Sequence, residues 1–391
     1  MIRTWLFVGR LLILLVVGVF VSACGSAQST SSQAPSSRPP SNPLIIGAPL
    51  AISGAHSVEG NLTKNGYDLW ADEVNKAGGI RIGRQRRMVQ IKYYDDESDA
   101  QKSAQFAERL ILEENVGLLL WPYGTVATDQ VAEIAERNGA AESICNHGYE
   151  YTFGVVSPAK QFAAAMIDLA VHQNPRPESI ALVFANDPFS LGVAEGAKAF
   201  AESLGVTVSV YERYQPNTSE QPGVVTLAKI TGAEMLLNAG QLVHSLAIIK
   251  AAKDLDYNPK LFGFTVGPAT PDFIEVLGED AEYVVTSSQW SETVGYKGVD
   301  LFGTPERYAE LYREKFDSSP DYHAASGTAA AVSLQAAIEN AGSLDPQEIR
   351  NALASLDIIT FYGPMVGSGL IIVVLTSTNR WWFNKFRMAN L

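Results

Sequence analysis

The feature that most constrains the fold is an alternation of short apolar segments with amphipathic segments, which begins at Pro43. Short apolar runs bounded by turn residues predict strands, and apolar residues recurring every three or four positions predict helices. Regular alternation of the two predicts parallel sheets covered by helices on both faces, which is an α/β fold. The predicted strands outnumber those of a typical single sheet, so two lobes are expected.

The predicted strands are Leu44–Leu50, Val89–Tyr94, Val116–Trp121, Ser179–Ala185, Val206–Tyr211, Ala233–Asn238, Lys260–Thr265 and Tyr283–Ser287. The predicted helices are Gly60–Lys76, Ser98–Glu114, Thr125–Asn138, Ser190–Leu204, Leu242–Leu255, Pro305–Phe316, Tyr322–Ala341 and Pro346–Leu356. The third of these strands is continuously apolar, which is typical of a buried parallel strand.

Residues 1–24 have the pattern of an export signal. Two arginines lie beside a short apolar run that ends in small residues before Cys24. This pattern predicts a secretory signal rather than a membrane span. The sequence V-S-A-C also resembles the bacterial lipobox, which implies that Cys24 is lipidated; an ordinary secretory signal is the alternative. Residues 25–42, rich in Ser and Pro, predict a flexible linker.

Composition excludes several classes of protein. With 47% hydrophobic residues the chain can form a core, so it is not a disordered protein. Its net charge of −13 argues against a nucleic-acid binder, which needs a basic surface. Two cysteines cannot form a disulfide scaffold, and Cys145 is interpreted as a buried thiol.

The chain contains no recognisable catalytic or metal-binding motif. It has no His-Glu-x-x-His, no Cys-x-x-Cys, no Gly-x-Ser-x-Gly and no phosphate-binding glycine loop. The acidic residues of segment 95–99 are interpreted as the capped start of a helix rather than as a cation site. We therefore expect neither an enzyme nor a cofactor or metal.

Binding by loops remains as the main hypothesis. In doubly wound sheets, ligands lie beyond the carboxyl ends of the strands, where helix N-termini present free N–H groups. Loops Pro49–Gly60, Pro122–Thr125, Asn186–Ser190 and Val266–Ala269 each follow a predicted strand. Thr125 is placed to cap a helix and hold a carboxylate. Aromatic residues also lie at the ends of elements: Trp121, Tyr123, Phe189, Trp290 and Tyr322.

Several stretches carry a family resemblance. IIGAPLAISGAHSVEG, EVNKAGGIRIGRQ, LLLWPYGT, VFANDPFSLGVAEGAKAF and FGFTVGPATPDF occur in this order, and the likeness runs from Pro43 to Gly363. The chain resembles the periplasmic solute-binding proteins of the branched-chain amino acid (Leu/Ile/Val-binding) type, which are the substrate-binding lipoproteins of ABC importers.

The resemblance implies the periplasmic binding protein type I fold, in which two doubly wound lobes are joined by three hinge crossovers. Lobe 1 would contain residues 43–157 and 288–361, and lobe 2 residues 158–287 and 362–391. The two lobes would close on a small polar ligand.

The resemblance also implies the ligand-binding residues. Tyr123, Gly124 and Thr125 would bind the ligand carboxylate, and Phe189 would supply an aromatic surface with Asp187 nearby. Further contacts would come from Gln241, Gly267, Gln289 and Trp290. Binding would be non-covalent.

Three departures from the family pattern matter. A strand is missing after helix Thr125–Asn138, so part of the site is absent or rebuilt from Glu142 and Ser143. No acid follows Thr265 to hold an ammonium group; either Asp187 substitutes for it or the ligand is not an α-amino acid. The C-terminus beyond Pro364 is atypical, which a frameshift or a divergent end would explain.

These observations predict a lipid-anchored, extracytoplasmic receptor of an ABC importer that captures an amino acid or amide. Its partners would be the solute, a permease of the branched-chain amino acid type and a bacterial membrane, reached through the lipid anchor. We expect a monomer. The alternative is a sensor module of a signalling system that uses the same clamp. An enzyme, or a damaged copy that folds poorly, are more distant alternatives.

Overall fold

The computed structural model describes residues 42–139, 151–216 and 221–367. Its strands are β1 (Leu44–Leu50), β2 (Ile80–Ile82), β3 (Gln85–Arg87), β4 (Val89–Asp95), β5 (Ser179–Ala185), β6 (Thr207–Tyr214), β7 (Met235–Ala239), β8 (Leu261–Phe264), β9 (Val284–Thr286), β10 (Asp357–Ile359) and β11 (Pro364–Val366). Its α-helices are α1 (Ser57–Lys76), α2 (Ala100–Leu112), α3 (Thr125–Gly139), α4 (Ala164–Val171), α5 (Pro188–Ser203), α6 (Pro222–Ile230), α7 (Leu242–Asp254), α8 (Pro271–Leu277), α9 (Pro305–Phe316), α10 (Tyr322–Ala341) and α11 (Pro346–Ala354).

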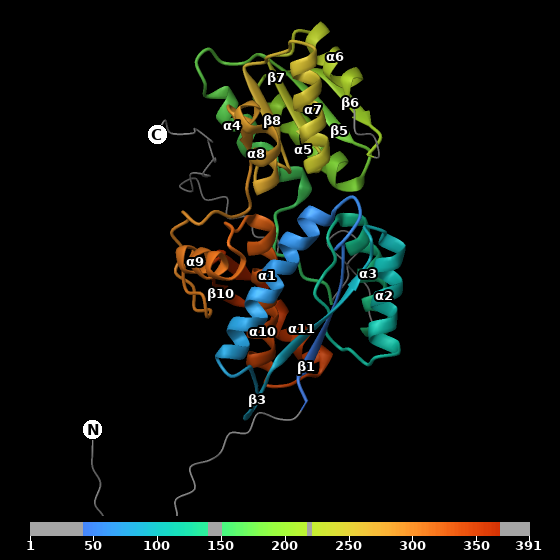
Figure 1. Cartoon of the computed structure of the whole chain (residues 1–391), viewed down its shortest axis with the longest axis vertical. Helices are drawn as coiled ribbons and strands as arrows, with labels where there is room; N and C mark the ends of the chain where they lie inside the picture. The colour runs from blue at the N-terminus through green and yellow to red at the C-terminus, as the bar shows by residue number, and fades with distance from the viewer. Residues whose placement is uncertain (1–41, 140–150, 217–220, 368–391) are drawn as a thin grey trace, which may run out of the picture. The chain divides into compact units, whose positions relative to one another are not determined.

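The main sheet has five parallel strands in the order β6-β5-β7-β8-β9. Its central strands β5 and β7 are buried on both faces, as is usual for parallel strands covered by helices. Figure 1 shows α5 and α7 beside these strands, and β1 in another part of the described chain with α1, α2 and α10. Parallel strands with crossover helices confirm the α/β prediction.

A second parallel sheet consists of β1 and β4, paired from Leu44 opposite Val89 to Leu50 opposite Asp95. Segment 116–121, predicted as a full strand, lies beside β1 but forms only one bridge, between Gly47 and Leu119. Two hydrogen bonds hold it there, from Gly47 N to Leu118 O (2.9 Å) and from Leu120 N to Gly47 O (2.8 Å). This segment leads directly to Tyr123.

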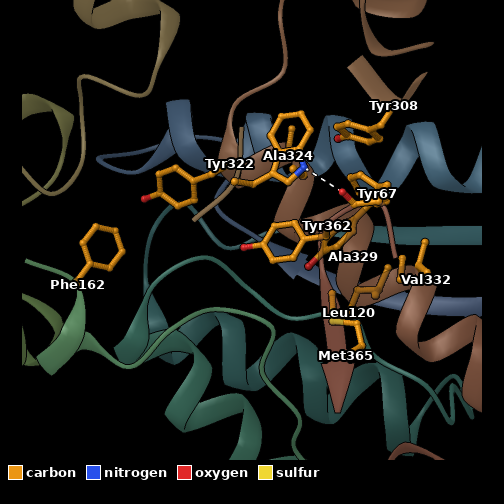
Figure 2. Packing of buried hydrophobic residues seen from close by; sticks show 14 of the residues in the cluster. Tyr67, Leu120, Phe162, Tyr308, Tyr322, Ala324, Ala329, Val332, Tyr362 and Met365 are labelled. Atoms are coloured by element: carbon orange, nitrogen blue, oxygen red, sulfur yellow. Dashed lines mark hydrogen bonds between the residues drawn. The ribbon is translucent and has the colours of Figure 1, made fainter. Parts of the chain in front are cut away.

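Helices α1 and α10 pack closely together and fix the position of the α10 N-terminus. A Cβ added to Gly66 of α1 would lie 2.1 Å from Ala324 O of α10, so only glycine permits this approach. The Thr328 hydroxyl donates a hydrogen bond to Gly66 O at 2.8 Å. Figure 2 shows the buried side chains around this contact, among them Tyr67, Tyr308 and Tyr362.

Several elements differ from the sequence expectations. Helices α4, α6 and α8 and the antiparallel hairpin β10–β11 were not predicted. The described residues do not include Cys24, Glu142, Ser143, Cys145 or residues 368–391 of the atypical C-terminal segment. The boundaries of the two lobes stay a prediction. Within the described ranges, no helix is both long enough and apolar enough to cross a membrane.

Candidate functional site

Tyr123 is the centre of a group of polar side chains that come from distant parts of the chain. Its hydroxyl donates a hydrogen bond to Gln241 Oε1 at 2.9 Å and lies 3.4 Å from His323 Nε2. Its ring centroid lies 5.5 Å from that of His323 and 5.8 Å from that of His56. We call this group, with Glu59 and Asp321, the Tyr123 cluster; it consists of His56, Glu59, Tyr123, Gln241, Asp321 and His323.

The parallel strands explain why these residues meet. His56 follows β1, Tyr123 follows segment 116–121, and Gln241 follows β7 immediately before α7. His56 and Gln241 lie beyond the carboxyl ends of strands, and Tyr123 lies beyond the end of a segment that bridges to β1, so all three lie where a doubly wound fold brings its loops together. The structure therefore unites Tyr123 and Gln241, which the sequence had placed in separate loops.

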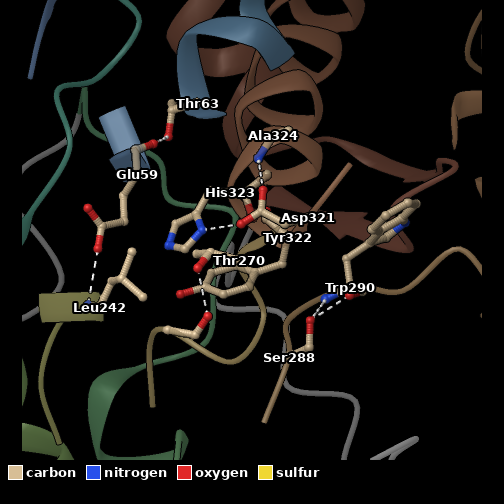
Figure 3. Close-up of polar contacts among 12 residues, drawn as sticks. Glu59, Thr63, Leu242, Thr270, Ser288, Trp290, Asp321, Tyr322, His323 and Ala324 are labelled. Atoms are coloured by element: carbon tan, nitrogen blue, oxygen red, sulfur yellow. Dashed lines mark hydrogen bonds and ion pairs between the residues drawn. The ribbon is translucent and has the colours of Figure 1, made fainter. Parts of the chain in front are cut away.

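Asp321 and His323 form a buried pair at the start of α10. Asp321 caps the helix: its Oδ1 accepts from Ala324 N at 3.0 Å, and its Oδ2 lies 2.5 Å from His323 Nδ1. Figure 3 shows Asp321 between Ala324 and His323. A carboxylate only accepts hydrogen bonds, so His323 Nδ1 carries a proton and Nε2 is left facing Tyr123.

Glu59 links α1 to the start of α7. This side chain is only 2% exposed, and its Oε1 accepts a hydrogen bond from Leu242 N at 3.3 Å. Figure 3 shows the carboxylate directed at Leu242. A carboxylate at a helix N-terminus interacts favourably with the free N–H groups and the helix dipole. The contact joins residues 183 positions apart in the sequence.

The surroundings keep the Tyr123 phenol protonated. Burial raises the pKa of Tyr123 well above its usual value, and the charges of Glu59, Asp321 and Asp187 raise it further. The hydroxyl is therefore a hydrogen-bond donor at any pH that the fold tolerates. Three carboxylates thus lie within electrostatic range of this one side chain.

Asp187 and Phe189 lie at the start of α5. The Phe189 ring packs edge-on against Phe162 at 5.5 Å, and Phe162 in turn meets Tyr322 at 6.3 Å. Asp187 caps α5: it accepts hydrogen bonds from the Ser190 N–H at 2.9 Å and from the Ser190 hydroxyl at 2.7 Å. Both carboxylate oxygens of Asp187 are therefore engaged within its own helix.

Gly124 and Thr125 form the start of α3. Gly124 has a φ of +94°, and a Cβ added there would meet no atom within 4 Å. Thr125 is exposed, and the Thr128 N–H and hydroxyl both donate to Gly124 O. A glycine in the N-cap position has no side chain that could accept a hydrogen bond. Gly124 therefore does not cap the first N–H groups of α3 through a side chain.

The remaining predicted ligand residues have partners within the protein. Gly267, with a φ of +112°, lies against Ser245 of α7. The Gln289 side chain accepts a hydrogen bond from Ser157 N at 3.0 Å, and so joins two segments far apart in the sequence. Trp290 is 5% exposed and packs against Tyr308 and Phe361 at ring distances of 5.4 and 6.2 Å. The structure does not bring Trp290 into contact with Tyr123.

Sequence reasoning missed Glu59, Asp321 and His323. Glu59 lies inside the predicted polar loop Pro49–Gly60, in the part that the structure shows as the first turn of α1, and Asp321 precedes a predicted helix as an N-cap residue does. Both positions indicate capping within the residue's own helix. Glu59 instead reaches the start of another helix, and nothing in the local sequence signals that contact.

Two cavities lie away from the cluster. One, of about 210 Å³, is lined mainly by apolar side chains beside segment 116–121, including Phe153, Leu334 and Ile349. The other, of about 560 Å³, lies at the amino ends of β8 and β9. Neither is lined by a predicted ligand residue. Within the described ranges, no three His, Cys, Asp or Glu side chains are grouped to hold a metal ion.

His244 makes the start of α7 sensitive to pH. Its Nδ1 accepts from Gln241 N at 3.1 Å, and its Nε2 lies 2.8 Å from Pro216 O, so the ring is neutral with its proton on Nε2. Burial lowers the pKa of His244. A lowered pKa gives stability that is complete above the unfolded value of about 6.5 and is lost as the pH falls through the folded value.

We therefore expect the melting temperature to fall between pH 7.5 and pH 5, and His244→Gln to reduce that fall. The matched control is His172→Gln, because His172 is exposed immediately after the last residue of α4. Thermal melts followed by circular dichroism measure both variants. A pH dependence unchanged in His244→Gln would contradict the expectation.

Comparisons with known proteins agree with the α/β fold. A family model described as periplasmic binding protein matches residues 43–368. Leu/Ile/Val-binding protein homolog 8 of Brucella abortus (strain 2308) is 23% identical over 332 residues, covering 80% of each chain. Homolog 7 of Brucella suis biovar 1 is 22% identical over 342 residues, covering 82% of this chain and 83% of the relative.

Solved structures show the same fold. The branched-chain amino acid transporter substrate-binding protein LivJ of Streptococcus pneumoniae, in complex with isoleucine, aligns with a TM-score of 0.71 and 18% identity, over 84% of this chain and 93% of LivJ. The leucine-binding protein LivK of Thermotoga maritima aligns with a TM-score of 0.70 and 19% identity, over 82% and 90%. These similar proteins are solute-binding proteins rather than enzymes.

Proposed function

The chain belongs to the periplasmic binding protein family, and we propose from this premise that it captures a small polar solute, an amino acid or amide, for an ABC importer. The solute would pass to a permease of the branched-chain amino acid type. The observation that carries the proposal is the Tyr123–Gln241 hydrogen bond, which joins the loops following two different parallel sheets. Such a junction of strand ends is where a doubly wound fold binds its ligands.

We place the ligand carboxylate at the start of α3. The N–H groups there are the natural partners of an anion, and Gly124 leaves room for close approach. The exposed Thr125 hydroxyl would add a further donor. The rings of Tyr123 and Phe189 would cover the apolar part of the ligand, and Gln241 would contact its polar groups. Asp187, Gly267, Gln289 and Trp290 would support the site through the internal contacts described above.

A thermal-shift screen tests the proposal. The probes are the common amino acids, their amides and small carboxylates, each added in excess to the folded protein. A ligand present at a hundred times its Kd stabilises the folded state by about 2.7 kcal/mol, which is easily detected. Stabilisation by at least one amino acid or amide is expected. A sharply melting sample that no probe stabilises would count against solute capture.

Lipid anchoring at Cys24 is a separate part of the proposal and is supported by the V-S-A-C sequence at the end of the signal. Two lobes divided near residues 157, 287 and 361 would then lie outside the membrane, on the linker 25–42. We expect the wild-type protein in the membrane fraction of expressing bacteria, and Cys24→Ser to lose that association. Cys145→Ser is the matched control. Equal membrane association of wild type and Cys24→Ser would contradict the anchor.

A further inference from the structure

Of the helices that begin near Tyr123, three have a carboxylate at the N-terminus: α5, α7 and α10. Asp187 caps α5 and Asp321 caps α10, each from the position just before its own helix. The start of α7 differs, because its carboxylate comes from Glu59 on another helix, α1. An anionic group of a ligand therefore meets an existing negative charge at each of these three helix starts.

The charges around Tyr123 are not balanced by basic side chains. Glu59, Asp187 and Asp321 all act on the Tyr123 phenol, and in the described part of the chain no lysine or arginine forms an ion pair with any of them. The basic titratable groups near these carboxylates are the histidines His56, His244 and His323. A ligand bound beside Tyr123 is thus exposed to a net negative field.

Glu59 differs from the two aspartates in its unused capacity to accept hydrogen bonds. Asp187 and Asp321 each use both oxygens in the contacts described above. Of the two carboxylate oxygens of Glu59, only Oε1 accepts a hydrogen bond from a described residue, and its donor is Leu242 N. The second oxygen, Oε2, can accept a donor from a ligand.

We propose that Glu59 is a specificity-determining residue: it accepts a hydrogen bond from a nitrogen at the far end of the ligand and rejects a second carboxylate there. The favoured ligands carry one carboxylate, bound at the start of α3, and a carboxamide or ammonium group at the other end. Two like charges in a partly desolvated site repel each other strongly, whereas an N–H donor is attracted to the carboxylate. The inference rests on the proposed solute capture and narrows its ligand class.

Isothermal titration calorimetry at about pH 8, where histidines are ordinarily neutral, tests the inference. The probes are L-glutamine against L-glutamate, L-asparagine against L-aspartate, and L-leucine. The wild type is expected to bind the amide of at least one pair ten-fold or more tightly than its acid. Glu59→Gln keeps the shape of the side chain and an acceptor for Leu242 N, and is expected to reduce that ratio to about three or less.

The matched control is Glu73→Gln, the same change on the same helix at a carboxylate that pairs with Lys76 at 2.6 Å. It is expected to keep the wild-type ratio, and Glu59→Asp, which keeps the charge, is expected still to reject the acid. An amide-to-acid ratio that survives Glu59→Gln would overturn the inference. Tighter wild-type binding of L-leucine than of either amide would also overturn it while leaving solute capture intact. Binding of no probe would overturn both.

Discussion

Replacing Trp290 with alanine is expected to lower the free energy of unfolding by about 3–5 kcal/mol, the usual cost of removing a large aromatic side chain from a core. Trp290 is 5% exposed, and its ring meets Tyr308 and Phe361 edge-on. Tyr308 stacks on Phe361 at 4.3 Å, so the loss of the indole opens a void between rings that cannot close freely. Denaturant unfolding followed by circular dichroism measures the change.

Trp290→Phe separates packing from hydrogen bonding at the same position. It retains a ring against Tyr308 but loses the indole N–H that donates to Phe361 O at 3.4 Å, so a loss of about 1–2 kcal/mol is expected. Where the alanine variant is still folded, its ligand affinity is expected to stay within a few-fold of wild type. A stable Trp290→Ala protein that no longer binds its ligand would instead assign Trp290 to the ligand.

Replacing Tyr123 with alanine is expected to weaken ligand binding at least a hundred-fold, which corresponds to about 2.7 kcal/mol. The side chain is surrounded by His56, His323 and Gln241, and its loss removes both a ring surface and a donor from the proposed site. Tyr123→Phe removes only the hydroxyl. A net loss of about 0.5–1.5 kcal/mol for one hydrogen bond predicts roughly two- to twelve-fold weaker binding.

The control for the hydroxyl is Tyr257→Phe, because the Tyr257 hydroxyl donates to Ala233 O at 2.8 Å, and both residues lie just before the amino ends of β8 and β7. Calorimetric titration with the amino acid identified by the thermal-shift screen gives the affinity of each variant. Tyr257→Phe is expected to bind as the wild type does. Wild-type affinity in Tyr123→Ala would place the ligand away from the Tyr123 cluster.

Elements with strong end signals were predictable from the sequence. Helices α9 and α10 begin and end at the predicted residues. Thr304 accepts from Arg307 N at 3.2 Å before Pro305, and Asp321 accepts from Ala324 N. Gly342 follows α10 with a φ of +63°. Caps of these kinds are encoded within a few residues, so local sequence suffices to locate them.

Elements that depend on distant contacts were not predictable. Helices α4, α6 and α8 are short, and short helices owe their stability to packing rather than to local propensity. Segment 116–121 has the composition of a full strand, yet its pairing with β1 is limited to the contacts around Gly47. Pairing is decided by the neighbours a strand finds, which its own residues do not specify.

The candidate site divides in the same way. Tyr123 was predicted because loops after parallel strands meet at one edge, a rule that needs no side-chain detail, whereas Gln241 was predicted only from the family resemblance. The partnership of Glu59 with Leu242 depends on how α1 meets α7, and no local pattern encodes it. Trp290 was predicted to bind the ligand because it is an aromatic residue at the end of an element. That position does not distinguish an aromatic residue that binds a ligand from one that packs in the core.

The most direct test of the central claim is a crystal structure of the protein with the solute identified by the thermal-shift screen. Density for the ligand is expected beside Tyr123, with its carboxylate at the N–H groups that begin α3 and its other polar groups within hydrogen-bond distance of Gln241. Ligand density in either of the two cavities away from Tyr123, with the Tyr123 cluster unchanged, would contradict the account.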